Sequence, residues 1–225
     1  TRVYYFYDFE RKHLTHPKLQ AIQVTQPKTE SIQTQMSAFP IKQIALLPGS
    51  RPSELKALIP IFESIRPKLL SRGFDLTYYL NQTSAQKLAS QLGVNQEHIQ
   101  KTPIKDIKAD FAICCSGTVT LEVALREIPM LVVYRTTWLN YLFLRTKVKV
   151  KWISLPNLIC QQSVVPELIQ NDCTPAHIMK IIDQFNHEQQ QTQIKQFRLM
   201  RENLSRAPRL ETHLAQNGPM SQEFV

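Results

Sequence analysis

The sequence predicts an α/β fold with a doubly wound parallel sheet, because short apolar strands alternate with helical segments between residues 41 and 187. Two of the chain's five glycines, Gly49 and Gly117, directly follow two of these strands. Open parallel sheets bind ligands at the carboxyl ends of their strands, and glycine lets the backbone approach a ligand closely. We therefore expect a binding site where these two loops meet.

The expected elements of the first half follow from local pattern. The apolar run 44–47 is a strand that ends at Pro48 and Gly49. Apolar residues at helical spacing predict a helix over 52–71, which Pro60 is expected to kink or split. The pattern then predicts strands at 74–80, 111–115 and 130–134, and helices at 84–92 (ending at Gly93) and 118–126.

The rest of the chain is less regular. We expect an apolar helix at 137–147, a last strand at 149–153, and helices at 164–170, 175–187 and 189–205. Apart from a strand-like run at 3–7, residues 1–40 are polar and Gln-rich and read as a linker or remnant. The chain thus divides into a linker at 1–40, a sheet domain at 41–187 and a helical tail at 188–225.

Composition favours an anionic partner. The 225 residues carry a net charge of +9, which suits phosphorylated small molecules or an anionic membrane surface. We expect no nucleic acid, because the chain has no basic helix and no aromatic-basic strand face. No apolar run approaches the roughly 20 residues of a spanning helix, and no signal peptide is apparent. The first residue is Thr, so we expect a trimmed chain or part of a longer one.

Metal binding and disulfides are not expected. The four cysteines lack metal-ligand spacing, and the six histidines form no HExxH or HxH cluster. Cys114 and Cys115 are neighbours in an apolar strand, so their side chains point to opposite faces of the sheet and cannot easily pair. We interpret all four cysteines as reduced packing residues of a cytosolic protein that uses no cofactor.

The first candidate motif is Leu-Leu-Pro-Gly-Ser-Arg at 46–51, followed by Glu54. It reads as a strand, a tight turn and a helix start, with Ser50 or Ser53 as the cap. Arg51 carries a forked set of donors that suits a pyrophosphate. The alternative is a capped turn with a surface arginine.

The second motif is Ser-Gly-Thr-Val-Thr-Leu-Glu at 116–122. A strand that turns through Gly117 into a helix presents free N–H groups and the positive end of a dipole to a phosphate. Glu122 lies one turn into the helix, where it could accept hydrogen bonds from sugar hydroxyls. The alternative is that Thr118 is only a cap and Glu122 only complements the helix dipole.

Two further segments have two interpretations each. Asn157 follows the expected strand 149–153 and can bond a hydroxyl, a phosphate or its own backbone in a turn. The stretch 138–151 is an apolar helix followed by lysines and an arginine. It is either buried or a surface that touches lipid.

Taken in order, these motifs resemble lipid-A-disaccharide synthase. The resemblance covers about residues 41–185. It runs through Leu-Leu-Pro-Gly-Ser-Arg-x-x-Glu at 46–54, Ala-Asp at 109–110, Ser-Gly-Thr-x-x-Leu-Glu at 116–122, Pro-Met-Leu-Val-Val-Tyr at 129–134, Ile-Ser-Leu-Pro-Asn at 153–157 and Val-Pro-Glu-Leu-Ile-Gln at 165–170.

The resemblance implies the Rossmann-like C-terminal half of a glycosyltransferase B fold. The family transfers 2,3-diacylglucosamine from UDP-2,3-diacylglucosamine to 2,3-diacylglucosamine 1-phosphate and releases UDP, at the cytoplasmic face of the inner membrane of Gram-negative bacteria. By analogy, the first loop would contact the nucleotide, the second turn the diphosphate, and Glu122 and Asn157 the hydroxyls in the same pocket. The implied UDP-sugar-binding residues are Gly49, Ser50, Arg51, Ser116, Gly117, Thr118, Glu122 and Asn157.

The sequence also departs from the family. The N-terminal half, with the acceptor site and the expected general base, is not recognisable, so the catalytic residues stay unassigned and the chain is expected to be inactive alone. Thr15-His16-Pro17 is the expected remnant of a Gly-His-Pro hinge, and Cys-Gln-Gln at 160–162 replaces an Ala-Gly-Arg-like stretch. The tail at 188–225 would have nothing to dock on in its own chain, so it is either mobile or docks on another chain, an N-terminal half or a second copy.

Two alternatives stay open at this point. The chain could belong to another UDP-sugar transferase or epimerase of the same fold. It could also be a non-catalytic remnant that keeps the sheet without turnover.

Overall fold

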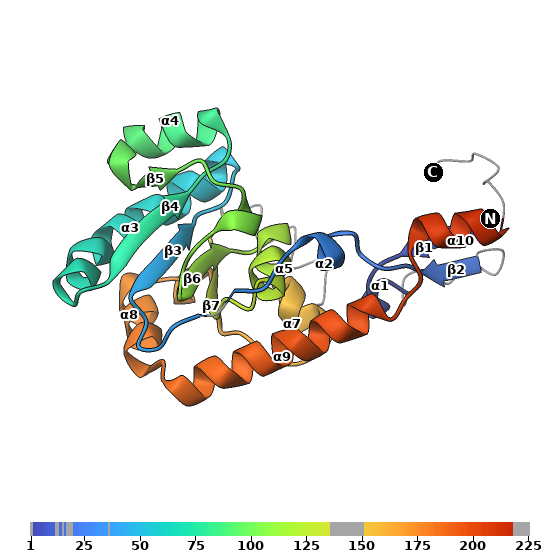
Figure 1. The fold of residues 1–225 in the computed structure, drawn as a ribbon. Coiled ribbons are helices and arrows are strands. Elements are labelled where there is room, and N and C mark those ends of the chain that lie inside the picture. Colours follow the sequence, from blue (N-terminus) through green and yellow to red (C-terminus); the bar gives the residue numbers. More distant parts are fainter. Residues whose placement is uncertain are drawn as a thin grey trace.

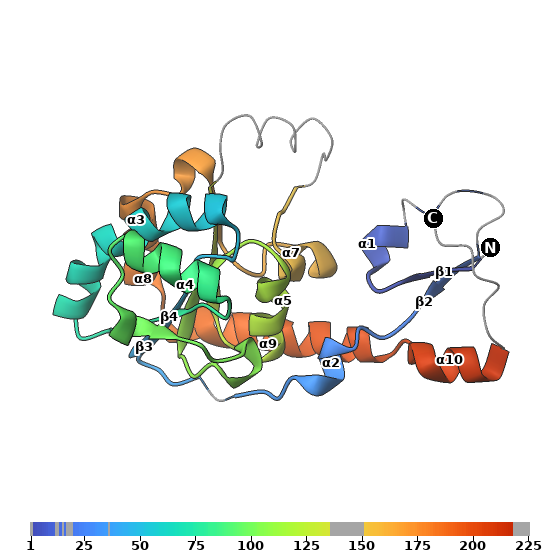
Figure 2. The same ribbon diagram turned by 90° about the horizontal axis from the view of Figure 1, so that it is seen from above.

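A computed structural model describes residues 2–11, 14, 16, 20–35, 37–135 and 151–217. The described residues form a large domain around one sheet and a small lobe at one end of the molecule (Figure 1). The long helix α9 (His187–Ser205) runs along the large domain toward the small lobe (Figure 2).

The sheet of the large domain has six parallel strands in the order β5-β4-β3-β6-β7-β8. Renumbered from the first of them, this order is 3-2-1-4-5-6, the strand order of dinucleotide-binding Rossmann sheets. The predicted fold class is therefore confirmed. The strands are β3 (Gln43–Leu47), β4 (Asp75–Tyr79), β5 (Ile99–Gln100), β6 (Phe111–Cys115), β7 (Met130–Tyr134) and β8 (Glu167–Ile169).

The central strands are apolar throughout because helices cover both faces of the sheet. In β6, Phe111, Ile113 and Cys115 face one buried cluster, whereas Ala112 and Cys114 face the other. The two neighbouring cysteines thus point to opposite faces, as predicted, and all four cysteines are free thiols.

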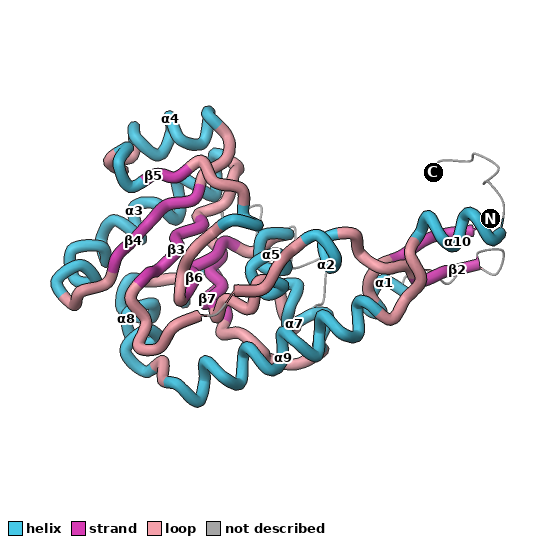
Figure 3. Tube along the Cα trace, in the orientation of Figure 1, coloured by secondary structure: helices cyan, strands magenta, loops and turns pink. Residues whose placement is uncertain are grey.

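In the part of the chain that the structure describes, helices pack on both faces of the sheet (Figure 3). One face carries α3 (Pro52–Ser71), α4 (Thr83–Gln91) and α8 (Pro175–Gln184). The other carries α5 (Thr118–Leu125), α7 (Leu155–Cys160) and α9. Short 3₁₀ turns occur at Gln96–His98, Ile104–Asp106 and Gln170–Asp172.

The expected split of the helix 52–71 is wrong. A single helix runs from Pro52 to Ser71 and contains both Pro60 and Pro67. An internal proline costs about 3 kcal/mol. The fully buried side chains of Leu58, Ile59 and Phe62 offset that cost, because they anchor both sides of Pro60 in the core.

Three later expectations also differ from the structure. The segment predicted as a helix at 164–170 contains the strand β8, which pairs with β7. Residues 151–153 form no strand, and the helix α7 (Leu155–Cys160) stands where a loop was expected. The expected helix at 137–147 and residues 149–150 lie outside the described residues.

The small lobe comes from residues read as linker. It contains β1 (Arg2–Tyr5), α1 (Asp8–Arg11) and β2 (Gln20–Gln23), with β1 and β2 paired in parallel. The helix α10 (Leu210–Asn217) lies at the same end of the molecule (Figure 2). The two chain segments that connect the lobe to the large domain meet at Thr25, whose N–H donates to the carbonyl of Pro208 at 3.0 Å.

The expectation that the tail has nothing to dock on is wrong for α9. Phe197 and Met200 of α9 are buried in the core cluster beside α5. The Gln193 amide accepts from the N–H of Met130 at 2.9 Å and donates to its carbonyl at 3.3 Å. Among the described residues, no helix is both long and apolar enough to cross a membrane.

Candidate functional site

The two glycine loops lie side by side at the carboxyl ends of β3 and β6, which are neighbours in the sheet. The strand order reverses between these strands, and this is where open α/β sheets form their binding crevice. A pocket of about 430 Å³ occupies the position. Its lining includes seven of the eight predicted residues: Gly49, Ser50, Arg51, Ser116, Gly117, Thr118 and Glu122.

The loop after β3 is fastened by Glu54 rather than by a serine. Its carboxylate accepts from the N–H groups of Ser50 at 3.1 Å and Arg51 at 3.2 Å. Arg51 is therefore the cap residue of α3, and the expectation that Ser50 or Ser53 caps this helix is wrong. The Glu54 side chain is 10% exposed, so one buried carboxylate sets the course of the whole loop.

Arg51 itself extends into solvent at the mouth of the pocket. Its side chain is 79% exposed and makes one ion pair, from Nη1 to Glu54 at 3.2 Å. An exposed pair of this kind contributes little to stability, about 0–1 kcal/mol. The guanidinium can therefore turn to an incoming anion at small cost.

The turn after β6 begins α5 without a side-chain cap. Gly117 is the cap residue, at φ +154°, and Thr118 is already the first helical residue. The alternative in which Thr118 only caps the helix is thus wrong. The first N–H groups of a helix have no intrahelical acceptor. They open here on the pocket at the positive end of the helix dipole, an arrangement that binds phosphate.

Ser116 and Thr120 fix this turn in place. The Ser116 N–H donates to Val133 at 3.0 Å, and its hydroxyl donates to the Ile153 carbonyl at 2.8 Å. The Thr120 hydroxyl donates to the Gly117 carbonyl at 2.8 Å. Thr120, which the sequence did not single out, therefore holds the backbone that faces the pocket.

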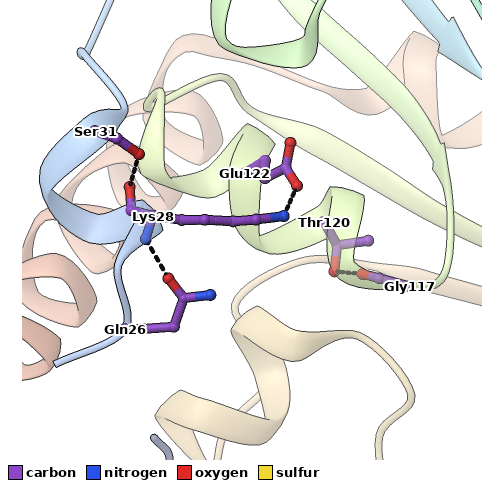
Figure 4. A network of polar contacts seen from close by, with 6 residues as sticks. All are labelled: Gln26, Lys28, Ser31, Gly117, Thr120 and Glu122. Carbon is purple, nitrogen blue, oxygen red and sulfur yellow. Dashed lines mark hydrogen bonds and ion pairs between the residues drawn. The ribbon is translucent and has the colours of Figure 1, made fainter. Parts of the chain in front are cut away.

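Glu122 lines the pocket and forms an ion pair that the sequence did not suggest. One carboxylate oxygen accepts from Nζ of Lys28, which lies on α2 (Lys28–Ser31). In Figure 4 the lysine side chain reaches across to α5, and the second carboxylate oxygen points away from it. Among the hydrogen bonds of the described residues, that second oxygen has no partner in Figure 4.

Asn157 is the one predicted site residue that the structure does not bring to the pocket. It is fully buried in α7, and its Oδ1 accepts from the N–H groups of Val164 at 2.7 Å and Val165 at 2.9 Å. Its Nδ2 donates to the Val165 carbonyl at 2.9 Å and to Glu167 at 2.8 Å. Both ends of the amide are therefore occupied by groups of the chain itself. Of the alternatives considered, hydrogen bonding to the protein's own backbone is the one that the structure shows.

Asn157 nevertheless supports the site from behind. Glu167 also binds the N–H groups of Ile153 and Ser154, each at 3.0 Å. The carbonyl of Ile153 in turn accepts from the hydroxyl of Ser116. The Leu-Pro-Asn segment is thus linked by hydrogen bonds to the turn after β6 that lines the pocket.

The opposite wall of the pocket was not predicted. Asn81 and Gln82 line it after β4, and Ile104 lines it from a 3₁₀ turn. The first two follow the carboxyl end of a predicted strand, so the rule that selected the glycine loops would also have selected them. Cys115 lines the pocket too, and burial raises the pKa of its thiol, which keeps it protonated.

Most of the expected hinge remnant and of the expected lipid-touching surface lies outside the described residues. Thr15 and Pro17 of the hinge motif lie outside the described residues, as does the stretch 138–151 apart from Lys151. In the part of the chain that the structure describes, the connection to the small lobe passes through 24–27 and returns at 206–209.

Taken as chemistry, the pocket presents backbone donors and an arginine to an anion, and a carboxylate oxygen to a hydroxyl. Both carboxylates of the described lining, Glu54 and Glu122, are engaged in ion pairs. The arrangement is therefore suited to gripping a phosphorylated sugar or nucleotide.

Comparisons with known proteins point to one family. The model of the lipid-A-disaccharide synthetase family matches residues 2–217. The lipid-A-disaccharide synthase of Hahella chejuensis is 36% identical over 179 residues, which cover 72% of this chain and 44% of that protein. Lipid-A-disaccharide synthase 1 of Legionella pneumophila strain Lens is 32% identical over 201 residues, or 84% and 52%. The chain thus spans about half the length of the curated relatives it matches.

Proposed function

The chain belongs to the lipid-A-disaccharide synthetase family, and on that premise we propose that it is the part of such an enzyme that binds the donor nucleotide. The observation that carries this proposal is the pocket between β3 and β6, where the Gly49 loop faces the uncapped start of α5. The donor is proposed to be UDP-2,3-diacylglucosamine, in line with the resemblance of the sequence motifs.

The diphosphate is proposed to lie against the first turn of α5. The N–H groups at Gly117 and Thr118 would donate to its oxygens, and no atom lies within 4 Å of where a Gly117 side chain would begin. Arg51 would swing from Glu54 to the same phosphates. Gly49 and Ser50 would contact the nucleotide through their backbone.

Glu122 is proposed to accept hydrogen bonds from the ribose or sugar hydroxyls with the oxygen that points away from Lys28. Asn157 is not proposed as a ligand contact, because its amide is fully used inside the chain. It maintains the turn that holds the diphosphate.

This arrangement suits glycosyl transfer because the departure of UDP leaves negative charge on the β-phosphate. Donors fixed in advance around that charge lower the barrier for bond cleavage. The helix N–H groups would provide such fixed donors here without a metal ion, and Arg51 would add a donor once it turns to the phosphates.

The whole reaction is proposed to need more than this chain. The acceptor, 2,3-diacylglucosamine 1-phosphate, and the general base are assigned to an N-terminal half, which would join this chain at the cytoplasmic face of the inner membrane. The chain alone is expected to bind UDP and to be inactive as a transferase. Adding the N-terminal half of the Hahella chejuensis relative to an assay with both lipid substrates tests this, with the disaccharide detected by mass spectrometry.

Calorimetric titration of the chain with UDP tests the nucleotide site directly. We expect binding that weakens about tenfold or more in Arg51→Ala and Glu122→Ala, since each removes a charge-assisted hydrogen bond of about 1.5–3 kcal/mol. Arg72→Ala is the matched control, because Arg72 pairs with Asp183 on the surface and does not line the pocket. The absence of heat at millimolar UDP, or equal affinities in all variants, would contradict the proposal.

A further inference from the structure

Lys28 reaches the candidate site from a part of the chain far from it in sequence. It is the first residue of α2, directly after the segment that connects the small lobe to the large domain. Its ammonium group contacts Glu122, 94 residues further along the chain. Figure 4 shows the extended side chain meeting one carboxylate oxygen end on.

The backbone that carries Lys28 is held firmly against α5. The guanidinium of Arg201, on α9, donates to the carbonyls of Thr29 at 2.9 Å and Ile32 at 3.0 Å. The same group also donates to the Leu125 carbonyl at the end of α5. One half-buried arginine thus joins α2 to the helix that bears Glu122, so the lysine is presented from a fixed position.

The charges of the pocket suggest a role for the ion pair between Lys28 and Glu122. A diphosphate would enter a pocket lined by two carboxylates, Glu54 and Glu122. Arg51 offsets the charge of Glu54, and the side chain of Glu122 is only 17% exposed, so water screens it poorly. Without Lys28, Glu122 would repel the diphosphate and would lose the contact that fixes its orientation.

We propose that Lys28 is a positioning residue of the nucleotide site: it offsets the charge of Glu122 and turns the second oxygen of that carboxylate to the ribose hydroxyls. This inference rests on the proposed function. Lys28 itself need not touch the nucleotide. Its effect should therefore appear in the recognition of the ribose more than in the binding of the phosphates alone.

The test compares UDP, 2′-deoxy-UDP and pyrophosphate as ligands of the intact chain by calorimetry. The unaltered chain should prefer UDP to 2′-deoxy-UDP. Lys28→Met should weaken the binding of UDP about five- to tenfold, so that the affinities for UDP and 2′-deoxy-UDP become similar. Its effect on the binding of pyrophosphate should be smaller. Lys28→Arg should restore most of the preference. In a Glu122→Gln background, Lys28→Met should cost less than it does alone.

Two controls separate this role from general effects. Lys180→Met removes the same charge from α8, where the residue lines a different pocket, and should leave all three affinities unchanged. Urea unfolding of each variant reports whether it is folded. If Lys28→Met does not fold, the comparison of Lys28→Arg and Lys28→Gln supplies the same readout.

The outcomes distinguish the two proposals. If UDP binding depends on Arg51 and Glu122 but not on Lys28, the proposed function stands and this inference fails. It also fails if Lys28→Met weakens UDP and pyrophosphate by the same factor, or if it tightens UDP, which would show that the lysine competes with the ligand. If the unaltered chain binds no UDP, both proposals fail together.

Discussion

Gly49 lies so close to Glu54 that a Cβ atom at position 49 would meet the carboxylate oxygen Oε2 at 2.3 Å. The same oxygen accepts from the N–H groups of Ser50 and Arg51. Glycine is thus required at this position for two reasons: the backbone has a φ of +93°, and there is no space for a side chain. The close approach is made to a side chain that holds the loop, before any ligand is considered.

Gly49→Ala should therefore destabilise the chain by about 2–4 kcal/mol, through backbone strain and displacement of Glu54. Gly73→Ala is the matched control, because Gly73 also has a positive φ, +81°, but nothing lies within 4 Å of its added Cβ. We expect urea unfolding to show a clearly smaller loss for Gly73→Ala. Equal losses would mean that strain alone explains Gly49.

Asn157→Asp should be strongly destabilising at neutral pH although the side chain keeps its shape. The donor Nδ2 would become a carboxylate oxygen facing the Val165 carbonyl and Glu167, both now within hydrogen-bond distance. A buried charge that faces two acceptors costs about 2–4 kcal/mol. Lowering the pH toward 4 should recover part of the loss, because a protonated carboxyl group can donate again.

Gln162→Glu is the matched control for this prediction. It also replaces an amide by a carboxylate, but at an exposed position of the adjoining turn. Its unfolding midpoint should barely move. Under conditions in which the Asn157→Asp variant is folded, its affinity for UDP should fall much less than the affinity of the Arg51→Ala variant. A large loss of affinity without loss of stability would instead return Asn157 to the ligand.

The fold was predictable where local pattern and burial agree. Strands such as β6 and β7 are buried on both faces, so each is a continuous apolar run bounded by turn residues. The strand β8 has only three half-buried residues at the sheet edge, too few to show a period. β1 overlaps the run 3–7, which reads as strand-like, but β2 was missed. A short polar strand such as β2 is defined by its partner rather than by its own sequence.

The site divides in the same way. Gly49 and Gly117 were predictable because the ends of parallel strands meet at one edge of the sheet. Lys28 was not, since nothing local relates it to Glu122 across 94 residues. Asn157 was placed in a loop, whereas its partners lie seven to ten residues ahead and remove it from solvent.

The cysteines should make the chain lose stability at alkaline pH. Burial raises the pKa of Cys160 and of Cys173 to about 11, from the 9.0 of a free thiol. The unfolded chain therefore ionises first as the pH rises, so this contribution is complete below about pH 9 and is lost between about pH 9 and 11. The urea midpoint should fall between pH 8 and pH 10, and Cys173→Ala should flatten that fall.

The same shift makes the thiols unreactive in the folded chain. At pH 8, a thiol with a pKa near 11 is about 0.1% thiolate, against about 10% for a free one. Alkylation by iodoacetamide should be roughly a hundredfold slower in the native state than in urea. Rapid native labelling of one cysteine would show that its surroundings are more open than the structure indicates.

Arg201 should contribute far more to stability than its neighbour Arg198, although both lie on α9. Arg201 serves three backbone carbonyls, and burial lowers the pKa of its guanidinium. Arg198 makes an ion pair with Glu127 from a side chain that is 62% exposed. Arg201→Met should cost about 2–4 kcal/mol by leaving those carbonyls without donors, and Arg198→Met less than about 1 kcal/mol.

Hydrogen exchange would show which part of the chain loses stability in the Arg201→Met variant. The amides of Thr29 and Ile32, which close the short helix α2 on Gln26 and Lys28, should lose protection well before those of β3. Because α2 carries Lys28, the same variant should also weaken the binding of UDP more than the binding of pyrophosphate, as we expect for Lys28→Met. If α2 keeps its protection while the global stability falls, Arg201 acts on the core alone, and the lysine is held in position by other contacts.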